Sequence, residues 1–394
     1  MKIVFVLPAF LPARGFGGPL NHVHAIAKIF KEKGHSVEIY TSNIANPSDL
    51  SKTLSDKEWI DGILVKRYPA PLRLAGYWVT PSMFADLKAG GYDILHAHLG
   101  RSFQCDLASF VSRLKHNPFL ITPHGSIGSH LDVDRGLKIH ALHTAHNLIA
   151  KYVLEAADRI IALNNFEKRH LLRLGVDSNK IAIIPNGISV SEFRRTYYDF
   201  KARHSIEGKF VLFVGRLDLV KGLDTLVQAF SIVKRSNFKN VRLVMVGEDW
   251  GFKKKLVELA GQYNISTDIL FIDRPSRADI ISAFQASEMV VLPSYYETFS
   301  ITMLEAFACA RPVITSAVGG MPEIVANKEN GLLVRPKDPK HLAEAITYLL
   351  NNEDVAKRMG SEGEKLVSQR FRIETVARQL ENLYCQLAEC HDQS

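Results

Sequence analysis

The chain lacks long apolar runs and a cysteine framework. Among its 394 residues, no uncharged stretch approaches the roughly 18 to 20 apolar residues that a membrane-spanning helix needs. The opening MKIVFVLPAF carries one lysine before a short apolar run, which predicts a first strand rather than a signal peptide. The four cysteines are scattered without a Cys-x-x-Cys pair, which disfavours a zinc site or disulfides and predicts a reducing, cytoplasmic compartment.

Two common nucleotide-binding motifs are also missing. No Gly-x4-Gly-Lys-Ser/Thr sequence occurs, so a P-loop is excluded. The segment PARGFGGPLNHV is rich in glycine, but Leu20 stands where the Gly-x-Gly-x-x-Gly motif places its third glycine. The second expected strand ends in YTSN, without the acidic residue that would hold a ribose. A nicotinamide-dependent enzyme is therefore disfavoured.

Positive charge is concentrated in the first half. Residues 1–190 contain 22 Lys and Arg against 15 Asp and Glu, whereas residues 191–394 contain 27 against 26. Twelve of the 15 histidines also lie in the first part. This asymmetry favours an anionic partner, either a phosphate-bearing substrate or the surface of a membrane. Nucleic acid is not expected, because the basic residues are dispersed and no nucleic-acid-binding motif is present.

Short β-rich runs alternate with longer amphipathic runs, and this alternation predicts an α/β fold with parallel sheets. A chain of this length exceeds the size of a single core, so we expect two domains. A polar stretch without a clear period, around residues 188–208, marks the linker. We therefore expect a Rossmann-like domain at 1–190 and another at 191–371, facing each other across a ligand cleft. The expected strands are KIVFVL, SVEIYT, GILVKRY, DILHAH, FLITPH, RIIALN, IAIIP, KFVLFVG, VRLVMVG, DILFID, MVVLPS, RPVITS and GLLVRP.

Ligands of such sheets bind at the carboxyl ends of the strands, so the functional residues should directly follow strands. In VGRLDLVKGLDTL, Arg216 and Lys221 flank a loop that enters a helix, which suits a diphosphate leaving group. Gly15, Gly17 and Gly18 precede the first helix, where free backbone N–H groups favour a phosphate. Each of these motifs is by itself also compatible with an ordinary turn or surface charge.

Further polar residues follow other strands. His124 in TPHGSIG would lie at a strand end, where an imidazole can donate to a sugar hydroxyl or a developing oxyanion. Asn186 in PNG and Glu323 in GGMPE occupy similar positions. His96 and His98 compete with His124 for its role. We expect these two imidazoles on opposite faces of their strand, unable to chelate one metal ion.

Two glutamates, Glu297 and Glu305, lie in YYETFSITMLEA after an apolar strand. The hydroxyl that begins TFSITMLEAFA is suited to N-capping, so Glu297 should precede a helix and Glu305 should lie about two turns into it. Their separation along the axis would then be roughly 10 Å or more. This exceeds the ~5 Å between the carboxylates of a retaining glycosidase. Separate carboxylates can instead accept hydrogen bonds from two sets of vicinal hydroxyls.

Taken in order, these motifs make the chain similar to the retaining glycosyltransferases of family 4, which have the two-domain GT-B fold. The strongest element is the Glu-x7-Glu signature, matched by Glu297 and Glu305. The resemblance implies that residues 372–394 pack back on the first domain. The other motifs that carry it are GHSVEIYT, TPHG, IPNGI, GRLDLVKG, PSYYETFSITMLEA and VGGMPEIV.

The resemblance also implies roles for individual residues. Arg216 and Lys221 look like the pair that grips the donor diphosphate. Glu297 resembles the residue that reads the donor sugar, and Glu305 the residue that accepts hydrogen bonds from the ribose. His124 resembles the cleft histidine near the primary hydroxyl of the sugar. The remaining expected donor contacts are Gly17, Gly18, Asn186, Gly215 and the backbone amides around Thr298, Phe299 and Ser300.

The implied reaction moves a sugar from a nucleoside-diphosphate sugar to an acceptor hydroxyl of a glycan, a lipid-linked sugar or a small molecule, with retention at the anomeric carbon. No Asp-x-Asp stands near Arg216, Lys221 or the glutamates, so neither a metal nor a cofactor beyond this co-substrate is expected. Three alternatives stay open: a nucleotide-sugar epimerase of the same fold, a hydrolase with Glu297 and Glu305 as acid and base, and a non-catalytic nucleotide-sugar-binding protein. The basic first half predicts peripheral association with the inner face of a membrane. The donor base, sugar, acceptor and oligomeric state are not indicated.

Overall fold

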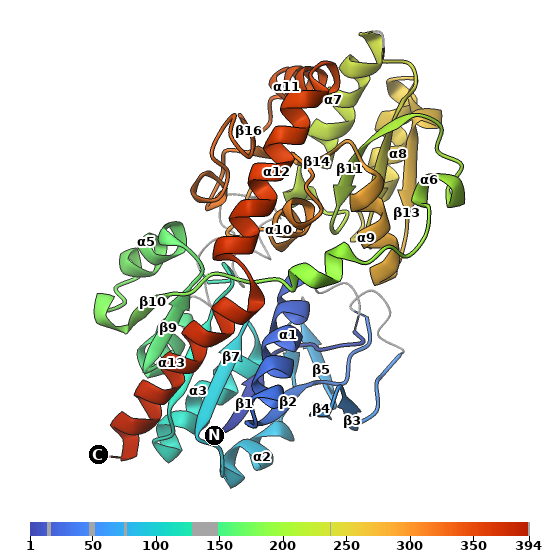
Figure 1. The fold of residues 1–394 in the computed structure, drawn as a ribbon. Helices are drawn as coiled ribbons and strands as arrows, with labels where there is room; N and C mark the ends of the chain where they lie inside the picture. Colours follow the sequence, from blue (N-terminus) through green and yellow to red (C-terminus); the bar gives the residue numbers. More distant parts are fainter. Residues whose placement is uncertain (14–16, 47–51, 75–76, 128–148, 237, 393–394) are drawn as a thin grey trace. The chain divides into compact units, whose positions relative to one another are not determined.

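The chain folds into two compact units (Figure 1). One comprises Met1–Gly187 and Ile373–Ser394, and the other comprises Ile188–Arg372. Each unit is an α/β structure built around its own sheet. The computed structural model describes the chain apart from residues 14–16, 47–51, 75–76, 128–148, 237 and 393–394.

The first unit contains an eight-stranded sheet with the order β10-β9-β8-β7-β1-β2-β4-β3. Only β3 runs antiparallel to its neighbour. The order reverses between β1 and β7, and a reversal of this kind is where open α/β sheets bind ligands. The strands are β1 (Lys2–Val6), β2 (Ser36–Ser42), β3 (Lys57–Ile60), β4 (Ile63–Tyr68), β7 (Ile94–His98), β8 (Phe119–Thr122), β9 (Arg159–Ala162) and β10 (Ile181–Ile183).

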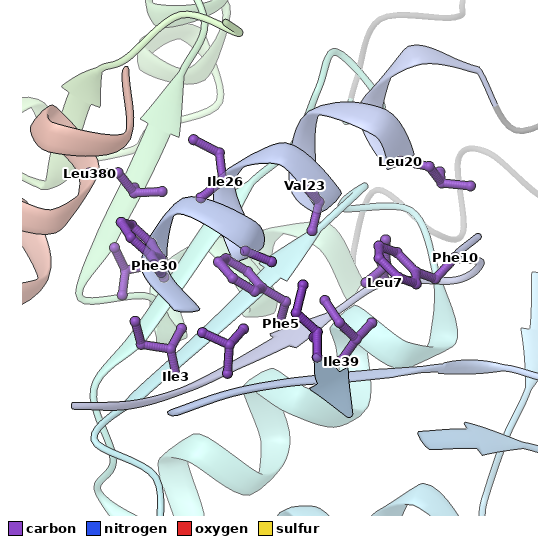
Figure 2. Close-up of a cluster of buried hydrophobic side chains, with 14 of the residues drawn as sticks. Ile3, Phe5, Leu7, Phe10, Leu20, Val23, Ile26, Phe30, Ile39 and Leu380 are labelled. Carbon is purple, nitrogen blue, oxygen red and sulfur yellow. The ribbon is translucent and has the colours of Figure 1, made fainter. Parts of the chain in front are cut away.

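Helices cover both faces of this sheet, because side chains along a strand alternate between the faces. In β1, Phe5 packs in a core with helices α1 and α13, whereas Val4 and Val6 belong to a second core on the other face. Figure 2 shows the first core, where Phe5 stacks on Phe30 of α1 with ring centroids 6.4 Å apart. Burying each such side chain contributes roughly 1.5–3 kcal/mol. The labelled helices of this unit are α1 (Gly18–Glu32), α2 (Met83–Ala89), α3 (Phe103–Lys115), α5 (Asn165–Arg173) and α13 (Ile373–Asp392).

Two further segments complete the description of the first unit. Strands β5 (Leu72–Leu74) and β6 (Tyr77–Val79) form a separate antiparallel pair. Residues 149–156 are helical. The sequence KIHALHTAHNLIAKYVLEAADR has the periodicity of a helix and predicts one over its whole length, but residues 138–148 of it lie outside the described residues.

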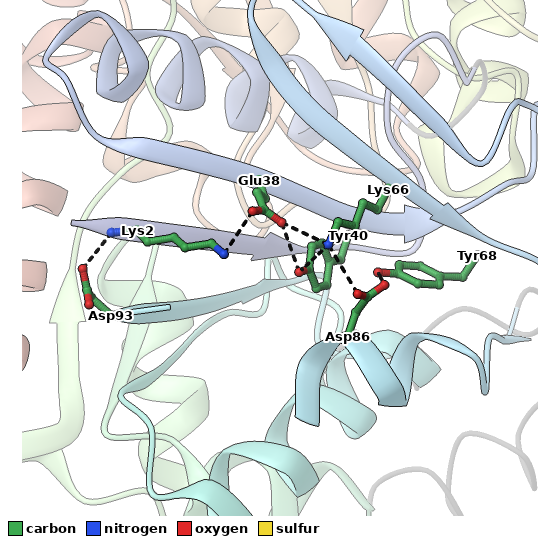
Figure 3. Close-up of polar contacts among 7 residues, drawn as sticks. All are labelled: Lys2, Glu38, Tyr40, Lys66, Tyr68, Asp86 and Asp93. Carbon is green, nitrogen blue, oxygen red and sulfur yellow. Dashed lines mark hydrogen bonds and ion pairs between the residues drawn. The ribbon is translucent and has the colours of Figure 1, made fainter. Parts of the chain in front are cut away.

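A network of charged side chains links β1, β2, β4 and α2 in the first unit (Figure 3). The Lys66 ammonium lies 3.4 Å from carboxylate oxygens of Glu38 and Asp86 and donates to the Tyr40 hydroxyl at 3.2 Å. Burial raises the pKa of Glu38, but the ammonium groups of Lys2 and Lys66 outweigh this and hold it below its ordinary value. Because these charges neutralise one another, we assign the network a structural role.

The second unit contains a six-stranded, all-parallel sheet with the order β13-β12-β11-β14-β15-β16. In chain order this is 3-2-1-4-5-6, the arrangement of a dinucleotide-binding domain, with its reversal between β11 and β14. Two Rossmann-like units with parallel sheets confirm the predicted fold class. The strands are β11 (Lys209–Val214), β12 (Val241–Val246), β13 (Ile269–Ile272), β14 (Met289–Leu292), β15 (Val313–Ser316) and β16 (Gly331–Val334).

In the second unit, five of the helices each follow a strand, as the alternation in the sequence predicts; the first helix precedes the first strand, and the last follows another helix. They are α6 (Phe200–Arg203), α7 (Leu223–Arg235), α8 (Lys253–Gln262), α9 (Arg277–Ala286), α10 (Ile301–Ala308), α11 (Pro339–Asn351) and α12 (Glu353–Arg370). Across the described part of the chain, no helix combines the length and apolar character needed to cross a membrane.

Candidate functional site

The loops after β11 and β14 bring Lys221 and Glu297 together. Lys221 ends a short 3-10 turn (Leu219–Lys221), and its Nζ lies 2.5 Å from Glu297 Oε2. Their side chains are 21% and 17% exposed, so the pair is partly desolvated. Glu297 Oε1 accepts no hydrogen bond from any residue that the structure describes. The pair therefore presents an ammonium and an open carboxylate oxygen at the reversal of strand order.

The loops that carry this pair touch through their backbones. Gly222, which follows Lys221, has φ 64°, and a Cβ there would lie 2.1 Å from the carbonyl oxygen of Pro293. Gly319, after β15, has φ 56°, and a Cβ there would lie 1.9 Å from the carbonyl oxygen of Glu297. A side chain at either glycine would force the backbone to move. The loops after β11, β14 and β15 are therefore held in one arrangement.

Arg216, the second predicted cation, stands on the same loop as Lys221, directly after Gly215. Its guanidinium carbon lies 4.4 Å from the centroid of the Trp250 ring, in the loop after β12. A Cβ at Gly247 would lie 1.8 Å from the Gly215 carbonyl oxygen, so these two loops also pack backbone to backbone. Our sequence analysis did not identify Trp250. The sequence feature that could have indicated Trp250 is an aromatic residue in the loop after a buried strand, in VGEDWG.

The helix after Glu297 begins later than predicted. Ser300, not Thr298, is the N-cap of α10, and its side chain accepts from the Met303 amide at 3.2 Å. The Thr298 hydroxyl instead lies 3.0 Å from the hydroxyl of Tyr296. Glu305 is consequently the fifth residue of α10, a little over one turn from its start, and the predicted two turns are wrong.

The start of α10 offers backbone donors to an anion. Thr298, Phe299 and Ser300 are all buried. Within the described part of the chain, the amides of Phe299 and Ser300 donate no hydrogen bond. A helix N-terminus with unsatisfied N–H groups favours phosphate. These amides and Lys221 follow strands that are neighbours in the sheet, β14 and β11.

Glu305 is not paired with Lys221 but with Arg277, the first residue of α9. Arg277 Nη1 lies 2.6 Å from Glu305 Oε1. The same guanidinium binds both carboxylate oxygens of Glu192, from Nε and Nη2, each at 2.9 Å. Burial raises the pKa of Glu305, and the charge of Arg277 opposes that effect. Neither Arg277 nor Glu192 was identified from the sequence, because no motif connects positions so far apart.

His124 lies in the first unit, within a cluster of buried histidines. Its Nε2 is 3.0 Å from Nδ1 of His98. The rings of His96 and His98 lie only 4.1 Å apart, so the prediction that they occupy opposite faces is wrong. Residues two apart on a strand share a face. His96 is also held by the Tyr384 hydroxyl at 2.6 Å.

Burial keeps these imidazoles neutral. It lowers the pKa of His22 to about 4 and that of His96 to about 3, and it lowers the pKa values of His98 and His124 as well. One nitrogen of each of the last two rings, His98 Nε2 and His124 Nδ1, is buried without a partner among the described residues. A neutral His124 can donate to or accept from a hydroxyl without carrying charge.

Glu167 fixes the turn that presents His124. Its carboxylate accepts from the amide of Gly125 at 2.6 Å and from that of Leu163 at 2.8 Å. His124 and Gly125 both have positive φ, 52° and 70°. Burial raises the pKa of Glu167 to about 7, against the effect of the two amides. This strained turn therefore depends on a buried carboxyl from α5.

His22 of α1 connects this turn to the other predicted residues of the first unit: its ring centroid lies 6.4 Å from that of His124, and its Nδ1 lies 3.2 Å from the amide nitrogen of Gly187, next to Asn186. Gly17 has φ 82° and precedes α1, of which Gly18 is the first residue. Gly15 lies outside the described residues. Asn186 is 1% exposed, and no described residue hydrogen-bonds to its Oδ1. The expected sites thus divide between the units: these residues and His124 in one, and the cations and glutamates in the other.

Comparisons with known proteins identify relatives of both units. Residues 16–192 match the family described as Glycosyltransferase Family 4, and residues 195–366 match Glycosyl transferases group 1. The D-inositol 3-phosphate glycosyltransferase of Corynebacterium diphtheriae is 26% identical over 100% of this chain and 96% of its own length.

Solved structures give the same result for the whole fold. Sucrose-phosphate synthase from Thermosynechococcus elongatus superposes with a TM-score of 0.81 at 26% identity, over 99% of this chain and 100% of that one. An Anabaena protein solved in complex with UDP-glucose has a TM-score of 0.78 at 20% identity, over 98% of this chain and 100% of that one. At 20% identity, the likeness to the Anabaena protein shows a shared fold alone.

Proposed function

We propose, since this chain belongs to the group 1 glycosyltransferases of family 4, that it moves a sugar from a nucleoside-diphosphate sugar to an acceptor hydroxyl. The transfer retains the configuration of the anomeric carbon and uses no divalent metal. The Lys221–Glu297 pair, at the reversal of strand order in the second unit, is the observation that carries this proposal.

The pair suits the two parts of such a donor. The Lys221 ammonium and the amides before α10 offer positive charge to the diphosphate, which gains charge as the bond to the sugar breaks. Arg216 extends that positive surface along the loop after β11. The open oxygen of Glu297 can accept from a sugar hydroxyl. Cations and helix dipoles would here do the work that a metal ion does elsewhere.

Retention is proposed on the same geometry. Because Lys221 engages one oxygen of the Glu297 carboxylate and we assign the other to a sugar hydroxyl, we place no glycosyl-enzyme intermediate on this group. The departing phosphate oxygen can instead take the proton of the acceptor hydroxyl on the same face of the sugar. The chain then contributes positioning and charge stabilisation.

The first test is a thermal-shift panel of UDP-, GDP-, ADP- and dTDP-sugars with the bare nucleotides, in excess EDTA. A selective rise in melting temperature for one nucleotide follows from binding to the folded state and supports a metal-independent donor site. If none of them raises the melting temperature at millimolar concentrations, the proposed donor site is wrong.

The second test follows the reaction of the donor that binds. Acceptors are screened by mass spectrometry, with inositol 3-phosphate included because a relative is named for it. Proton NMR of the product then gives its anomeric configuration. Inversion would refute the retaining mechanism. Conversion of the donor sugar without an acceptor would indicate an epimerase, release of free sugar would indicate a hydrolase, and binding without turnover would indicate a non-catalytic protein.

We also propose that the first unit docks on the cytoplasmic face of an anionic membrane that carries a lipid-linked acceptor. On α3, Phe110 and Leu114 are about half exposed, at 50% and 53%. Arg113 and Lys115 accompany them in the last turn, and the Arg113 guanidinium lies 4.4 Å from the Tyr152 ring centroid. An apolar surface with cations beside it favours an anionic lipid interface.

Liposome co-sedimentation tests this docking. We expect binding to vesicles with 30% anionic lipid and weaker binding to neutral vesicles, and we expect Phe110→Ser with Leu114→Ser to reduce it. Val257→Ser on α8, where the side chain is 48% exposed, is the matched control in the second unit. Equal absence of binding to both vesicle types would end this part of the proposal.

A further inference from the structure

We infer that Arg277 is a positioning residue for the donor: its contact with one oxygen of Glu305 orients that carboxylate, so that the other, open oxygen can accept from the vicinal hydroxyls of a ribose. The inference rests on the proposed function, because it takes the ligand to be a nucleoside diphosphate. It assigns a role to a residue that lies outside the Glu-x7-Glu signature.

The two oxygens of Glu305 have different surroundings. Oε1 is engaged by Arg277 Nη1 at 2.6 Å. Oε2 accepts no hydrogen bond from any described residue, and it is not sealed from solvent. The side chain as a whole is only 8% exposed, so little of it other than this oxygen can meet a ligand. Glu297 shows the same division, with one oxygen on Lys221 and the other open.

Arg277 is itself held from several sides. Glu192 binds its Nε and Nη2 in a two-pronged contact, with both distances at 2.9 Å. The Phe193 ring lies 4.8 Å from its guanidinium carbon. Ser276 and Asp279 form a capping box at the start of α9, which fixes the backbone that carries the side chain. The guanidinium therefore has one orientation, and Nη1 is directed at Glu305.

The positive charge of Arg277 favours the ionised form of Glu305. Burial works against an ionised Glu305, and Arg277 is the cation that offsets it. The other titratable groups that bear on this site are Glu192, Cys309, Arg311 and Glu364. Burial raises the pKa of Cys309 to about 12, so this thiol is neutral near pH 7. Arg311 is directed elsewhere, at the carbonyls of Ser287 and Gln285.

Without Arg277, the carboxyl of Glu305 would be buried beside the like charge of Glu192. It would then bind a proton more readily, and a protonated carboxyl is a poorer acceptor for two hydroxyls. A purely structural role of Arg277, joining α9 to residues 190–194, would leave ribose recognition unchanged. The two roles therefore differ in how the protein distinguishes ribose from deoxyribose.

The test measures affinities of UDP, GDP and ADP, each against its 2′-deoxy counterpart, by calorimetry at pH 7.5. The wild type should prefer the ribose form of its nucleotide by about tenfold, the value of one charge-assisted hydrogen bond. Arg277→Gln should lose this preference. Arg311→Gln is the matched control, since it removes a nearby guanidinium that donates to the carbonyls of Ser287 and Gln285 rather than to Glu305, and it should keep the preference.

A pH series adds a second readout. For Arg277→Gln, affinity for the ribose form should depend more steeply on pH than it does for the wild type, because the variant lacks the cation that favours ionised Glu305. Arg277→Lys, which retains the cation, should restore the pH dependence of the wild type. Arg277→Met, which removes the cation, serves if Arg277→Gln does not fold. An unchanged ribose preference in Arg277→Gln, or in Arg277→Met if Arg277→Gln does not fold, overturns the inference alone. Failure of the wild type to bind any of the three diphosphates overturns the proposed function and the inference with it.

Discussion

At the scale of single residues, Lys221 and Glu297 depend on each other. The 2.5 Å contact between them neutralises two partly buried charges, and removing either one leaves the other without its partner. The ammonium has two further N–H donors, so it can keep the carboxylate and still bind a phosphate. In our proposal, Lys221 therefore holds both the sugar-binding carboxylate and the leaving group.

The first prediction is that Lys221→Met and Glu297→Gln each lower kcat/KM by about 100- to 1000-fold, the usual cost of losing one stabilising group at a developing charge. Initial rates at varied donor concentration measure this effect. Circular dichroism and melting temperature should show that both variants fold.

The control for this prediction lies at the other end of β11. Lys209, the first residue of that strand, pairs with Glu353 far from the strand-end loops. Lys209→Met removes a comparable ion pair and should leave kcat/KM within about twofold of the wild type, because exposed pairs contribute little. If Lys221→Met behaved like Lys209→Met, the role given to Lys221 would be wrong.

At the scale of elements, every strand that the sequence predicted is present. They could be predicted because a strand buried on both faces of a parallel sheet is a short run of apolar residues, visible in the sequence without knowledge of its neighbours. Strands β3, β5 and β6 were missed. β3 is a half-exposed edge strand whose side chains alternate in burial. The sequence IDGI could have indicated β3, because Asp-Gly between apolar residues is typical of a hairpin turn. In the structure, Asp61 and Gly62 both have positive φ and form the tight turn to β4.

The positions of the candidate site could be predicted for a related reason. Parallel strands end at one edge of a sheet, so residues that directly follow them gather there. The roles given to these residues stay predictions. Contacts made by side chains were not predictable: the pairing of Glu305 with Arg277 depends on how α9 packs, and the choice of Ser300 over Thr298 as N-cap depends on Tyr296.

The second prediction concerns the packing of the loops. Gly319→Ala should displace the backbone of Glu297, because its Cβ would lie 1.9 Å from that carbonyl oxygen. Gly251→Ala meets only the strain of a positive φ, 87°, with no atom within 4 Å. We expect Gly251→Ala to lower the unfolding free energy by about 1–2 kcal/mol.

Gly319→Ala should cost at least twice as much stability as Gly251→Ala and should also raise the donor KM, since Glu297 moves with its backbone. Urea unfolding and steady-state kinetics give the two quantities. Equal losses of stability in the two variants would show that the loop after β15 accommodates a side chain, and that the close contact does not position Glu297.

At the scale of the whole molecule, the two units differ in their buried titratable groups. The first unit buries His22, His96, His98 and His124, and burial lowers the pKa of each of them. In the unfolded chain these groups have pKa values near 6.5. Below that pH the unfolded chain therefore binds protons that the folded unit cannot, and the stability of the first unit falls as the pH falls.

Glu167 acts in the opposite direction. Its pKa of about 7 lies above the ordinary value of 4.5, so its contribution is present below pH 4.5 and is lost as the pH rises through 7. Between pH 6.5 and pH 5, it should stabilise the fold by roughly 2 kcal/mol, while His22 and His96 together should cost about 3 kcal/mol. The histidines outweigh the glutamate, and His98 and His124 add to their effect.

The third prediction is that acidification from pH 7 to pH 5 opens the first unit before the second. Hydrogen exchange, corrected for its intrinsic rate, should show faster exchange at pH 5 in peptides that cover β7 and β8, and little change in those that cover β11 and β12. His22→Gln should reduce the pH dependence by about one proton, because it removes one buried imidazole while leaving an acceptor for the Gly187 amide. His204→Gln in the second unit should leave it unchanged. Equal opening of both units, or no effect of His22→Gln, would mean that the buried histidines do not set the acid stability.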